Sequence, residues 1–495
     1  MVNVEVVETP ELGDRSYVAH DGATAVVVDP QRDIDRIEGL LTAHRLRCAF
    51  VAETHVHNDY VSGGLDLAGR WGADYLLADG ERLPFQRRNV NDGDEFVAGN
   101  LRVKAVATPG HTFDHVTYLV DDGSTPVAFT GGSLLFGSVG RTDLLGEEHT
   151  ETLARLQFRS ARRLGELLGD DVPVYPTHGF GSFCSTGNMT ATTASTIGAE
   201  RAHNDAFTIP DEEAFVSRLV AGLTAYPAYY AHMGARNRAG AAPADLSAVT
   251  RVDPGELRKR IAGGEWVVDL RSRVAFARAH LTGTVSVALD VSFATYLGWL
   301  IPWGTPLTLI GETEHVVAEA QRQLVRIGID RPAGAWFGTT EDLGSDEPLR
   351  GYPVIGFAEL ANARDLAVVD VRRHDERREG HLPGSIHIPI HEILSRLDEL
   401  PTGQLAVHCA SGYRASIAAS LLDGMGRDVV LVDDDWTNAR TSGLSIVTPE
   451  PEAHDGSETP SPGPDRAPRT TDGRSVRRNW KTLRRNERTA PPRRH

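Results

Sequence analysis

Residues 405–425, LAVHCASGYRASIAASLLDGM, decide the fold of the C-terminal part of this chain. The stretch predicts an apolar strand, a short loop that begins at Cys409, and a helix with small residues on one face. The loop leads into the helix N-terminus, where unpaired backbone N–H groups and the positive end of the helix dipole favour an anion. A thiolate at Cys409 is therefore expected to be nucleophilic at neutral pH.

The loop after this cysteine is the predicted binding site for whatever the sulfur carries. Gly412 lets the loop curl so that its N–H groups point inward, and Arg414 adds a fixed positive charge. The binding loop is expected to consist of Ala410, Ser411, Gly412 and Tyr413. Protein tyrosine phosphatases place one more residue between cysteine and arginine, so this shorter loop favours a single sulfur over a phosphate. An inert buried cysteine is the alternative.

The surrounding sequence resembles a rhodanese domain over about residues 355–440. The resemblance covers VVDVR (368–372), EGHLPGSIHIP (379–389) and the cysteine loop. It implies that Cys409 carries a persulfide in a cradle of loop amides. It also implies that Arg372 and Glu376 buttress the site.

A second copy of this pattern precedes the first. The sequence VVDLRSRVAFARAHLTGTVSVAL (267–289) matches VVDVRRHDERREGHLPGSIHIPI (368–390) without a gap. Each copy then has a further strand, but Gly311 stands in the earlier copy where Cys409 stands in the later one. The earlier copy therefore has no nucleophile, and we expect it to be a scaffold or an interface domain.

The N-terminal third alternates short apolar strands with a few helices, which predicts two packed sheets with helices outside. His55 and His57 directly follow one strand, and Asp59 extends the series. His111 and His178 follow two later strands, in TPGHTFDH and YPTHG. Histidines in three loops that open from strand ends indicate a metal site.

Residues 1–190 resemble the metallo-β-lactamase superfamily and, within it, the persulfide dioxygenases, which GRTDLLG (140–146) also matches. The resemblance implies a single Fe(II), with His55 and His111 on the two iron-binding histidines. It implies oxidation of a low-molecular-weight thiol persulfide to sulfite. Tyr60 stands where two-metal hydrolases have a further histidine, so the second metal site is expected to be lost.

One departure counts against an intact iron site. Gly132, in FTGGSLL, stands where the family supplies an aspartate ligand. His57, Asp59 or His178 are the candidates to replace it, and an all-histidine site would also suit zinc. Cys184 is either a sulfur relay near the same mouth or a small buried residue, and Cys48 is expected in the core.

Composition limits the class of protein. The chain has 495 residues, a net charge of −17 and three cysteines far apart in sequence. These values favour a multi-domain cytoplasmic protein with free thiols, without nucleic-acid binding and without a membrane segment. The N-terminal residues lack the apolar core of a signal peptide. A homo-oligomer remains open.

The sequence thus predicts an α/β multi-domain chain: an αββα metallo-β-lactamase sandwich, two α/β rhodanese-like domains and a disordered tail. The expected parts are the sandwich at 1–190, a helical extension and linker at 191–248, a degenerate rhodanese-like domain at 249–343, a rhodanese domain with Cys409 at 352–443, and the tail at 445–495.

The expected function is oxidation of a thiol persulfide at iron, coupled to sulfurtransfer that involves thiosulfate or sulfite. A sulfurtransferase with a degenerate metal domain and a zinc-dependent thioester hydrolase are the alternatives.

Overall fold

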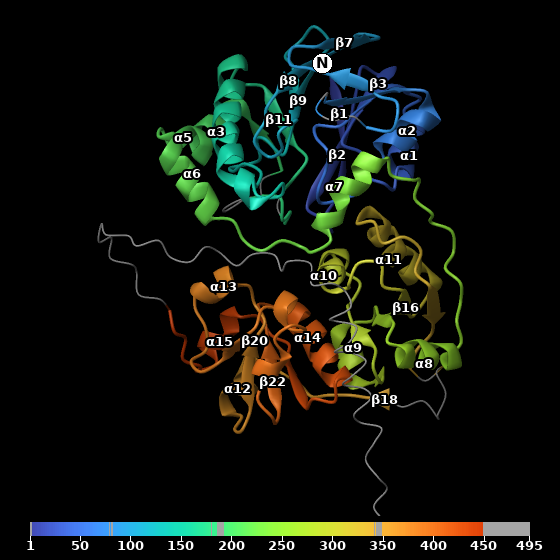
Figure 1. The fold of residues 1–495 in the computed structure, drawn as a ribbon, viewed down its shortest axis with the longest axis vertical. Helices are drawn as coiled ribbons and strands as arrows, with labels where there is room; N and C mark the ends of the chain where they lie inside the picture. The colour runs from blue at the N-terminus through green and yellow to red at the C-terminus, as the bar shows by residue number, and fades with distance from the viewer. Residues whose placement is uncertain are drawn as a thin grey trace, which may run out of the picture. The chain divides into compact units, whose positions relative to one another are not determined.

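The computed structural model describes residues 2–78, 80, 83–179, 181–185, 193–340, 342 and 349–448. The chain separates into two compact units, one of residues 1–245 and 322–330, the other of residues 246–321 and 331–495 (Figure 1). From residue 449 on, the predicted tail lies outside the described residues. No helix in the described part of the chain is long and apolar enough to cross a membrane.

The first unit contains two six-stranded sheets. In spatial order, the first sheet consists of β1 (Asn3–Thr9), β2 (Asp14–His20), β3 (Thr24–Val28), β4 (Arg47–Ala52), β5 (Asp74–Ala78) and β6 (Arg88–Val90). The second consists of β12 (Ser195–Thr196), β11 (Pro173–Pro176), β10 (Val127–Gly131), β9 (Val116–Asp121), β8 (Leu101–Ala107) and β7 (Glu95–Ala98). Strands β3 to β6 run parallel, whereas most of the second sheet is antiparallel.

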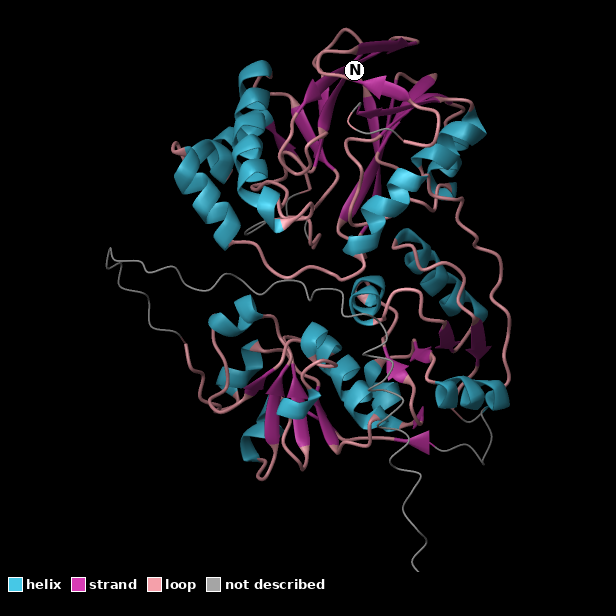
Figure 2. Ribbon diagram, viewed as in Figure 1, coloured by secondary structure: helices cyan, strands magenta, loops and turns pink. Residues whose placement is uncertain are grey.

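Helices cover the outer faces of both sheets, as Figure 2 shows. The helices of this unit are α1 (Asp35–Ala43), α2 (Gly64–Trp71), α3 (Thr150–Leu167), α4 (Ile197–His203), α5 (Asp205–Thr208), α6 (Glu212–Ala221) and α7 (Tyr230–Ala239). Apolar side chains such as Tyr17, Phe50 and Phe129 form one core between the sheets. Separate clusters form beneath α1 and α2 and beneath α3 to α6. The predicted αββα sandwich is confirmed.

The segment predicted as an extension and linker contributes to this sandwich. Strand β12 pairs with β11, and Phe215 of α6 packs its ring 5.2 Å from that of Phe158 in α3. The outer helical layer of the second sheet therefore needs residues beyond 190, because α3 alone leaves apolar surface uncovered.

The described part of the second unit contains two parallel sheets of short strands separated by helices, and a two-stranded antiparallel sheet of β14 (His280–Leu281) and β18 (Leu349–Arg350). The earlier copy comprises α8 (Pro254–Gly263), β13 (Trp266–Asp269), α9 (Arg273–Arg278), β14 (His280–Leu281), β15 (Val285–Ser286), α10 (Phe293–Leu300), β16 (Leu307–Gly311), α11 (Glu314–Arg326) and β17 (Gly334–Phe337). The later copy comprises β18 (Leu349–Arg350), β19 (Val354–Ile355), α12 (Phe357–Asn362), β20 (Ala367–Asp370), α13 (His374–Arg378), β21 (Ile386–His387), β22 (Leu405–His408), α14 (Tyr413–Gly424), β23 (Val429–Val432) and α15 (Thr437–Thr441).

The internal repeat has the same hydrogen-bonded register in both copies. Strands β13 and β15 pair Asp269 with Ser286, and β20 and β21 pair Asp370 with His387 at the equivalent positions. Arg271 Nη2 lies 2.6 Å from Asp269 Oδ2, and Arg372 Nη2 lies 2.7 Å from Asp370 Oδ2. These matching ion pairs show that both copies adopt one supersecondary fold. The ordered chain also continues slightly past 445, because Val447 pairs with His381.

Candidate metal centre and cysteine site

Three imidazoles meet where strands of the first unit end. His55 follows β4, His111 lies between β8 and β9, and His178 follows β11. The ring centroids form a triangle, with 4.8 Å between His55 and His111, 5.2 Å between His111 and His178, and 5.6 Å between His55 and His178. Each ring is buried, and each Nε2 atom lacks a partner among the described residues.

The opposite nitrogen of each ring is held by a hydrogen bond. Nδ1 of His111 lies 2.7 Å from the carbonyl oxygen of Arg141, which can only accept. Nδ1 of His178 lies 2.9 Å from Asp14 Oδ1. Both rings therefore carry a hydrogen on Nδ1, which leaves Nε2 as the nitrogen that can bind a metal ion when the ring is neutral.

The tautomer of His55 follows from its neighbour. Thr54 Oγ1 donates its only hydrogen to Asp29 Oδ2 at 2.7 Å, so it must accept from Nδ1 of His55 at 2.9 Å. All three rings thus present an Nε2 atom without a partner among the described residues.

Burial separates the charge states of these rings. Desolvation and the neighbouring imidazoles lower the pKa of His55 well below its usual value, and they lower that of His111 to about 3. Burial also disfavours a charged His178, but the carboxylates of Asp59 and Asp14 outweigh it and raise its pKa to about 9. A metal ion at this site would therefore displace a proton from His178.

His57 has different surroundings from the other three rings. Its Nε2 atom lies 2.9 Å from the Tyr60 hydroxyl, 3.1 Å from Glu53 and 3.3 Å from Asp29. Although burial opposes it, the two carboxylates raise the pKa of His57 to about 10. Its Nδ1 atom lacks a partner in the described structure, and His57 lies close enough to His55 and His178 to be a further candidate ligand.

Asp59 approaches His178 from the outer edge of the ring. Its Oδ2 atom lies 3.2 Å from Nδ1 of His178, the nitrogen that Asp14 also contacts. Since Nε2 of His178 is the nitrogen without a partner, the Asp59 carboxylate acts at Nδ1, the opposite nitrogen. There it orients the ring and helps to raise its pKa.

The backbone around Gly132 explains why this position has no side chain. A Cβ atom there would lie 2.3 Å from Cδ2 and 2.7 Å from Cγ of His111. The amide of Gly132 also donates to Nε2 of His115 at 3.0 Å, which fixes the backbone. The His111 ring therefore fills the space that an aspartate side chain at this position would need.

Several residues of the site were not predicted. They are Asp14, Asp29, Glu53, His115 and Arg141, all of them buried. Asp29 directly follows the apolar strand β3 with a positive φ of 51°, a polar residue in a strained position that could have indicated a role. The other four give no comparable signal, because their partners lie far away in the sequence.

The donor set fits a metal ion. His55, His111 and His178 supply three neutral nitrogen ligands with oriented rings, and soft or borderline divalent cations accept such ligands. This set suits iron or zinc equally.

The second chemical site is the loop that joins β22 to α14. Cys409 ends the strand and is buried, and Gly412 precedes the helix with a φ of +88°. A Cβ atom on Gly412 would lie 2.0 Å from Asp433 Oδ1, so this turn requires glycine. No described residue offers an acceptor to the N–H groups of Ala410, Ser411 and Gly412.

The two residues predicted to support the loop, Glu376 and Arg372, make different contacts. Arg414 pairs with Glu376, with Nη2 2.6 Å from Oε1. Arg372 is bonded to Asp370 instead, and its guanidinium lies 3.8 Å from the ring centre of Trp436. The backbone amide of Trp436 in turn donates to the carbonyl of Ala410 at 2.7 Å.

The earlier copy also supports this loop. Nε of Arg273 lies 2.5 Å from Asp433 Oδ1, and its Nη2 lies 3.3 Å from the carbonyl of Ser411. The hydroxyl of Tyr413 donates to the carbonyl of Ala288 at 2.8 Å. Arg273 and Ala288 both belong to the copy without a cysteine.

That copy cannot hold a nucleophile of its own. A Cβ atom on Gly311 would lie 2.9 Å from Val317 Cγ2, so apolar packing fills the equivalent pocket.

Comparison with known proteins places both units in families. The rhodanese-like domain family matches residues 356–441. The human persulfide dioxygenase ETHE1 is 30% identical over 41% of this chain and 72% of its own length. A hydroxyacylglutathione hydrolase from Brucella anthropi is 30% identical over 49% of this chain and 89% of its own. The chain belongs to this metallo-β-lactamase-fold family, fused to a rhodanese-like domain.

A solved structure resembles more of the chain. A metallo-β-lactamase from Staphylococcus aureus superposes with a TM-score of 0.61 and 27% identity, covering 68% of this chain and 99% of that one. Several other hydroxyacylglutathione hydrolases align over only about half of their length. The family relationship is therefore shown, whereas the activity has to be argued from the sites.

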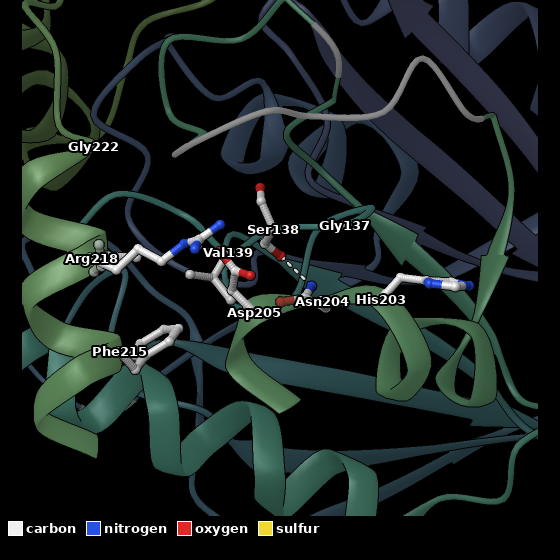
Figure 3. Close-up of a pocket in the computed structure, with 10 residues that line it drawn as sticks. Gly137, Ser138, Val139, His203, Asn204, Asp205, Phe215, Arg218 and Gly222 are labelled. Carbon is white, nitrogen blue, oxygen red and sulfur yellow. Dashed lines mark hydrogen bonds and ion pairs between the residues drawn. The ribbon is translucent and has the colours of Figure 1, made fainter. Parts of the chain in front are cut away.

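A pocket of about 340 Å³ in the metallo-β-lactamase-fold unit lies apart from this chemistry (Figure 3). Asn204 closes one side by donating to the carbonyl of Ser138 at 2.7 Å, and Arg218 pairs with Asp205 at 2.7 Å. None of the lining residues belongs to the imidazole cluster or the cysteine loop.

Restoring the family aspartate by Gly132→Asp should damage this protein. The new side chain must displace the His111 ring, so the free energy of unfolding should fall by about 1–3 kcal/mol. Urea denaturation would measure the loss. Gly39→Asp is the control, because a Cβ atom at Gly39 in α1 meets no atom within 4 Å. A Gly132→Asp protein with wild-type stability and tighter iron binding would contradict this packing argument.

Arg273→Ala should slow sulfurtransfer at Cys409 by roughly 3- to 10-fold, which corresponds to ~1 kcal/mol of lost hydrogen bonding to the loop. The reactivity of Cys409 toward an alkylating reagent should change at the same time, since the loop carries the thiol. Arg278→Ala on the same helix is the matched control, because Arg278 is exposed. Equal sulfurtransfer rates in the two variants would show that Arg273 does not position the loop.

Proposed function

We propose that this protein oxidises a low-molecular-weight thiol persulfide to sulfite at one metal ion and transfers sulfane sulfur at Cys409. In the oxidation, the persulfide, one dioxygen and one water give thiol, sulfite and protons. The sulfane sulfur loses four electrons, and dioxygen gains them.

The observation that carries the proposal is a set of three neighbouring buried imidazoles whose Nε2 atoms lack partners among the described residues. These imidazoles belong to His55, His111 and His178, and Tyr60 stands where a two-metal hydrolase needs another histidine. The Tyr60 hydroxyl is buried between Nε2 of His57 and the carbonyl of Asp29, and burial holds its pKa well above the usual value. Because this phenol stays neutral, it is a poor ligand, and the arrangement favours one ion over a bridged pair.

An iron ion held by these nitrogens would supply the one-electron chemistry that lets dioxygen react with sulfur. The buried residues around the imidazoles exclude water, and the carboxylates among them determine the charge of the site. Asp59 lies against Nδ1 of His178, and Asp29 and Glu53 lie against the neighbouring His57, so carboxylates close to the site favour a cation.

A small pocket of about 70 Å³ lies next to two of these histidines in the sequence, and it would admit only the sulfur end of a carrier thiol. It is lined by Val56 and Thr112, the neighbours of His55 and His111 in sequence, together with Phe113, Leu145, Asp114 and Arg238.

Sulfurtransfer needs only the groups around Cys409. Its thiolate attacks the outer sulfur of thiosulfate, the S–S bond breaks, and sulfite leaves with the bonding electron pair. The persulfide then sits in the loop N–H groups beside Arg414 until a second nucleophile takes the sulfur. Joining both activities in one chain raises the effective concentration of a reactive intermediate.

Two other functions make different predictions. A sulfurtransferase with an inactive metal domain would consume no dioxygen. A zinc-dependent thioester hydrolase, the activity named for the Brucella anthropi relative, would release thiol from an S-acyl substrate.

Two variants should separate the proposed activities. Cys409→Ser loaded with Fe(II) should keep dioxygen uptake with the persulfide of glutathione, cysteine or coenzyme A and lose thiosulfate:cyanide sulfurtransfer. His111→Ala should lose the uptake and keep the sulfurtransfer, because the two sites use different residues. An oxygen electrode and a thiocyanate assay give the two readouts.

Cys48→Ser, at a core cysteine bonded to the carbonyl of Phe50, is the matched control and should keep both activities. Folded wild-type protein without dioxygen uptake for any carrier would contradict the oxidation. Thiol release from an S-acyl substrate would favour the hydrolase. Sulfurtransfer that survives in Cys409→Ser would contradict the role of this cysteine.

A further inference from the structure

Among the described residues, no carboxylate is grouped with His55 or His111 as a candidate metal ligand. Gly132 supplies none and has no room for one. Asp59 and Asp14 both contact His178 at Nδ1, behind the ring. Asp29 and Glu53 contact His57. A divalent cation bound only to neutral imidazoles would remain without direct charge compensation.

Cys184 lies close to two of these imidazoles, those of His111 and His178. Its side chain is fully buried, and its sulfur lies within 4.8 Å of the candidate ligand nitrogens of His111 and His178. On both rings the nitrogen without a partner among the described residues is Nε2, which is the atom that each ring can offer to a metal ion.

The backbone places this cysteine close to the position of the missing aspartate. The amide of Gly140 donates to the carbonyl of Gly132 at 3.0 Å, and the amide of Arg141 donates to the carbonyl of Cys184 at 2.8 Å. Gly140 and Ser185 also form an antiparallel bridge. The segment 140–141 thus connects residue 132 on one side to Cys184 on the other.

Arg141 fixes the same segment by its side chain. Its guanidinium is buried, pairs with Asp143 at 2.7 Å, and donates to the carbonyl of Phe183 at 2.9 Å. The amide of Cys184 donates to Ser182 Oγ at 3.2 Å. These bonds hold the backbone of Cys184 on both sides.

We propose that the Cys184 thiolate is the anionic metal ligand of this protein and takes the role of the carboxylate absent at position 132. The cation would bind Cys184 together with His111, His178 and His55. Binding releases the thiol proton and forms the metal–sulfur bond, so the oxidation state of the sulfur does not change. The inference rests on the metal centre proposed above, but it holds for either iron or zinc.

This assignment has a consequence for sulfur transfer. A cysteine whose sulfur is bound to the metal is not free to accept a sulfane sulfur during the reaction. Cys184 is then a ligand and not a relay, and Cys409 is the cysteine that carries persulfide.

Cobalt(II) tests the proposal without any activity assay. Metal-free full-length protein is titrated with Co(II) under anaerobic conditions. Visible d–d bands report binding by nitrogen ligands, and a near-ultraviolet charge-transfer band reports a thiolate on the metal. We expect both in the wild type. Cys184→Ser and Cys184→Ala should lose the charge-transfer band and bind Co(II) at least about tenfold more weakly, the loss that even an outer partner of a ligand causes.

Cys409→Ser and Cys48→Ser are the matched controls and should keep the charge-transfer band. Circular dichroism establishes that each variant is folded. If the band is absent from wild-type protein that shows d–d bands, or persists in Cys184→Ala, this inference is wrong while the metal centre stands. If folded wild-type protein shows no Co(II) bands at all, the metal centre and the proposed oxidation fail together.

Discussion

The hydrogen bonds to Nδ1 of His55, His111 and His178 determine how the centre of the first unit is organised. Burying three imidazoles in one space is unfavourable unless one nitrogen of each is satisfied and the rings stay neutral or paired. Thr54, the Arg141 carbonyl and Asp14 meet that need, and each comes from a different part of the chain. The three Nε2 atoms they leave unpaired are the best reason to regard this unit as a metal protein.

Much of the architecture could be predicted from the sequence, because local patterns specify it. Alternating apolar strands predicted the two packed sheets, and the gapless repeat predicted two copies of one fold. In the structure, each copy has its own Asp–Arg ion pair at the equivalent position. The outer helices α4 to α6 were interpreted as a linker, since their few apolar residues show their role only when packed against α3. A helix can be predicted from neighbouring residues, whereas its place in an outer helical layer depends on residues far away in the sequence.

The candidate sites differ in the same way. Cys409, Gly412 and Arg414 lie within one loop, so their chemistry could be read from six consecutive residues. The metal cluster could be predicted only in part, because Asp14, Asp29 and Glu53 become relevant through contacts made by folding. From the sequence, Gly132 is interpreted as the position of a missing ligand. In the structure, the His111 ring occupies the space that a side chain at residue 132 would need. The glycine and the position of the ring therefore depend on each other.

The account depends on one ion being bound by His55, His111 and His178. The most direct test is the metal content of protein loaded with Fe(II) under anaerobic conditions and dialysed, measured by elemental analysis against protein concentration. We predict one iron per chain in the wild type and a loss of most of it in His178→Ala. Two ions per chain would indicate a hydrolase-type pair, and no retained metal would contradict the proposed centre.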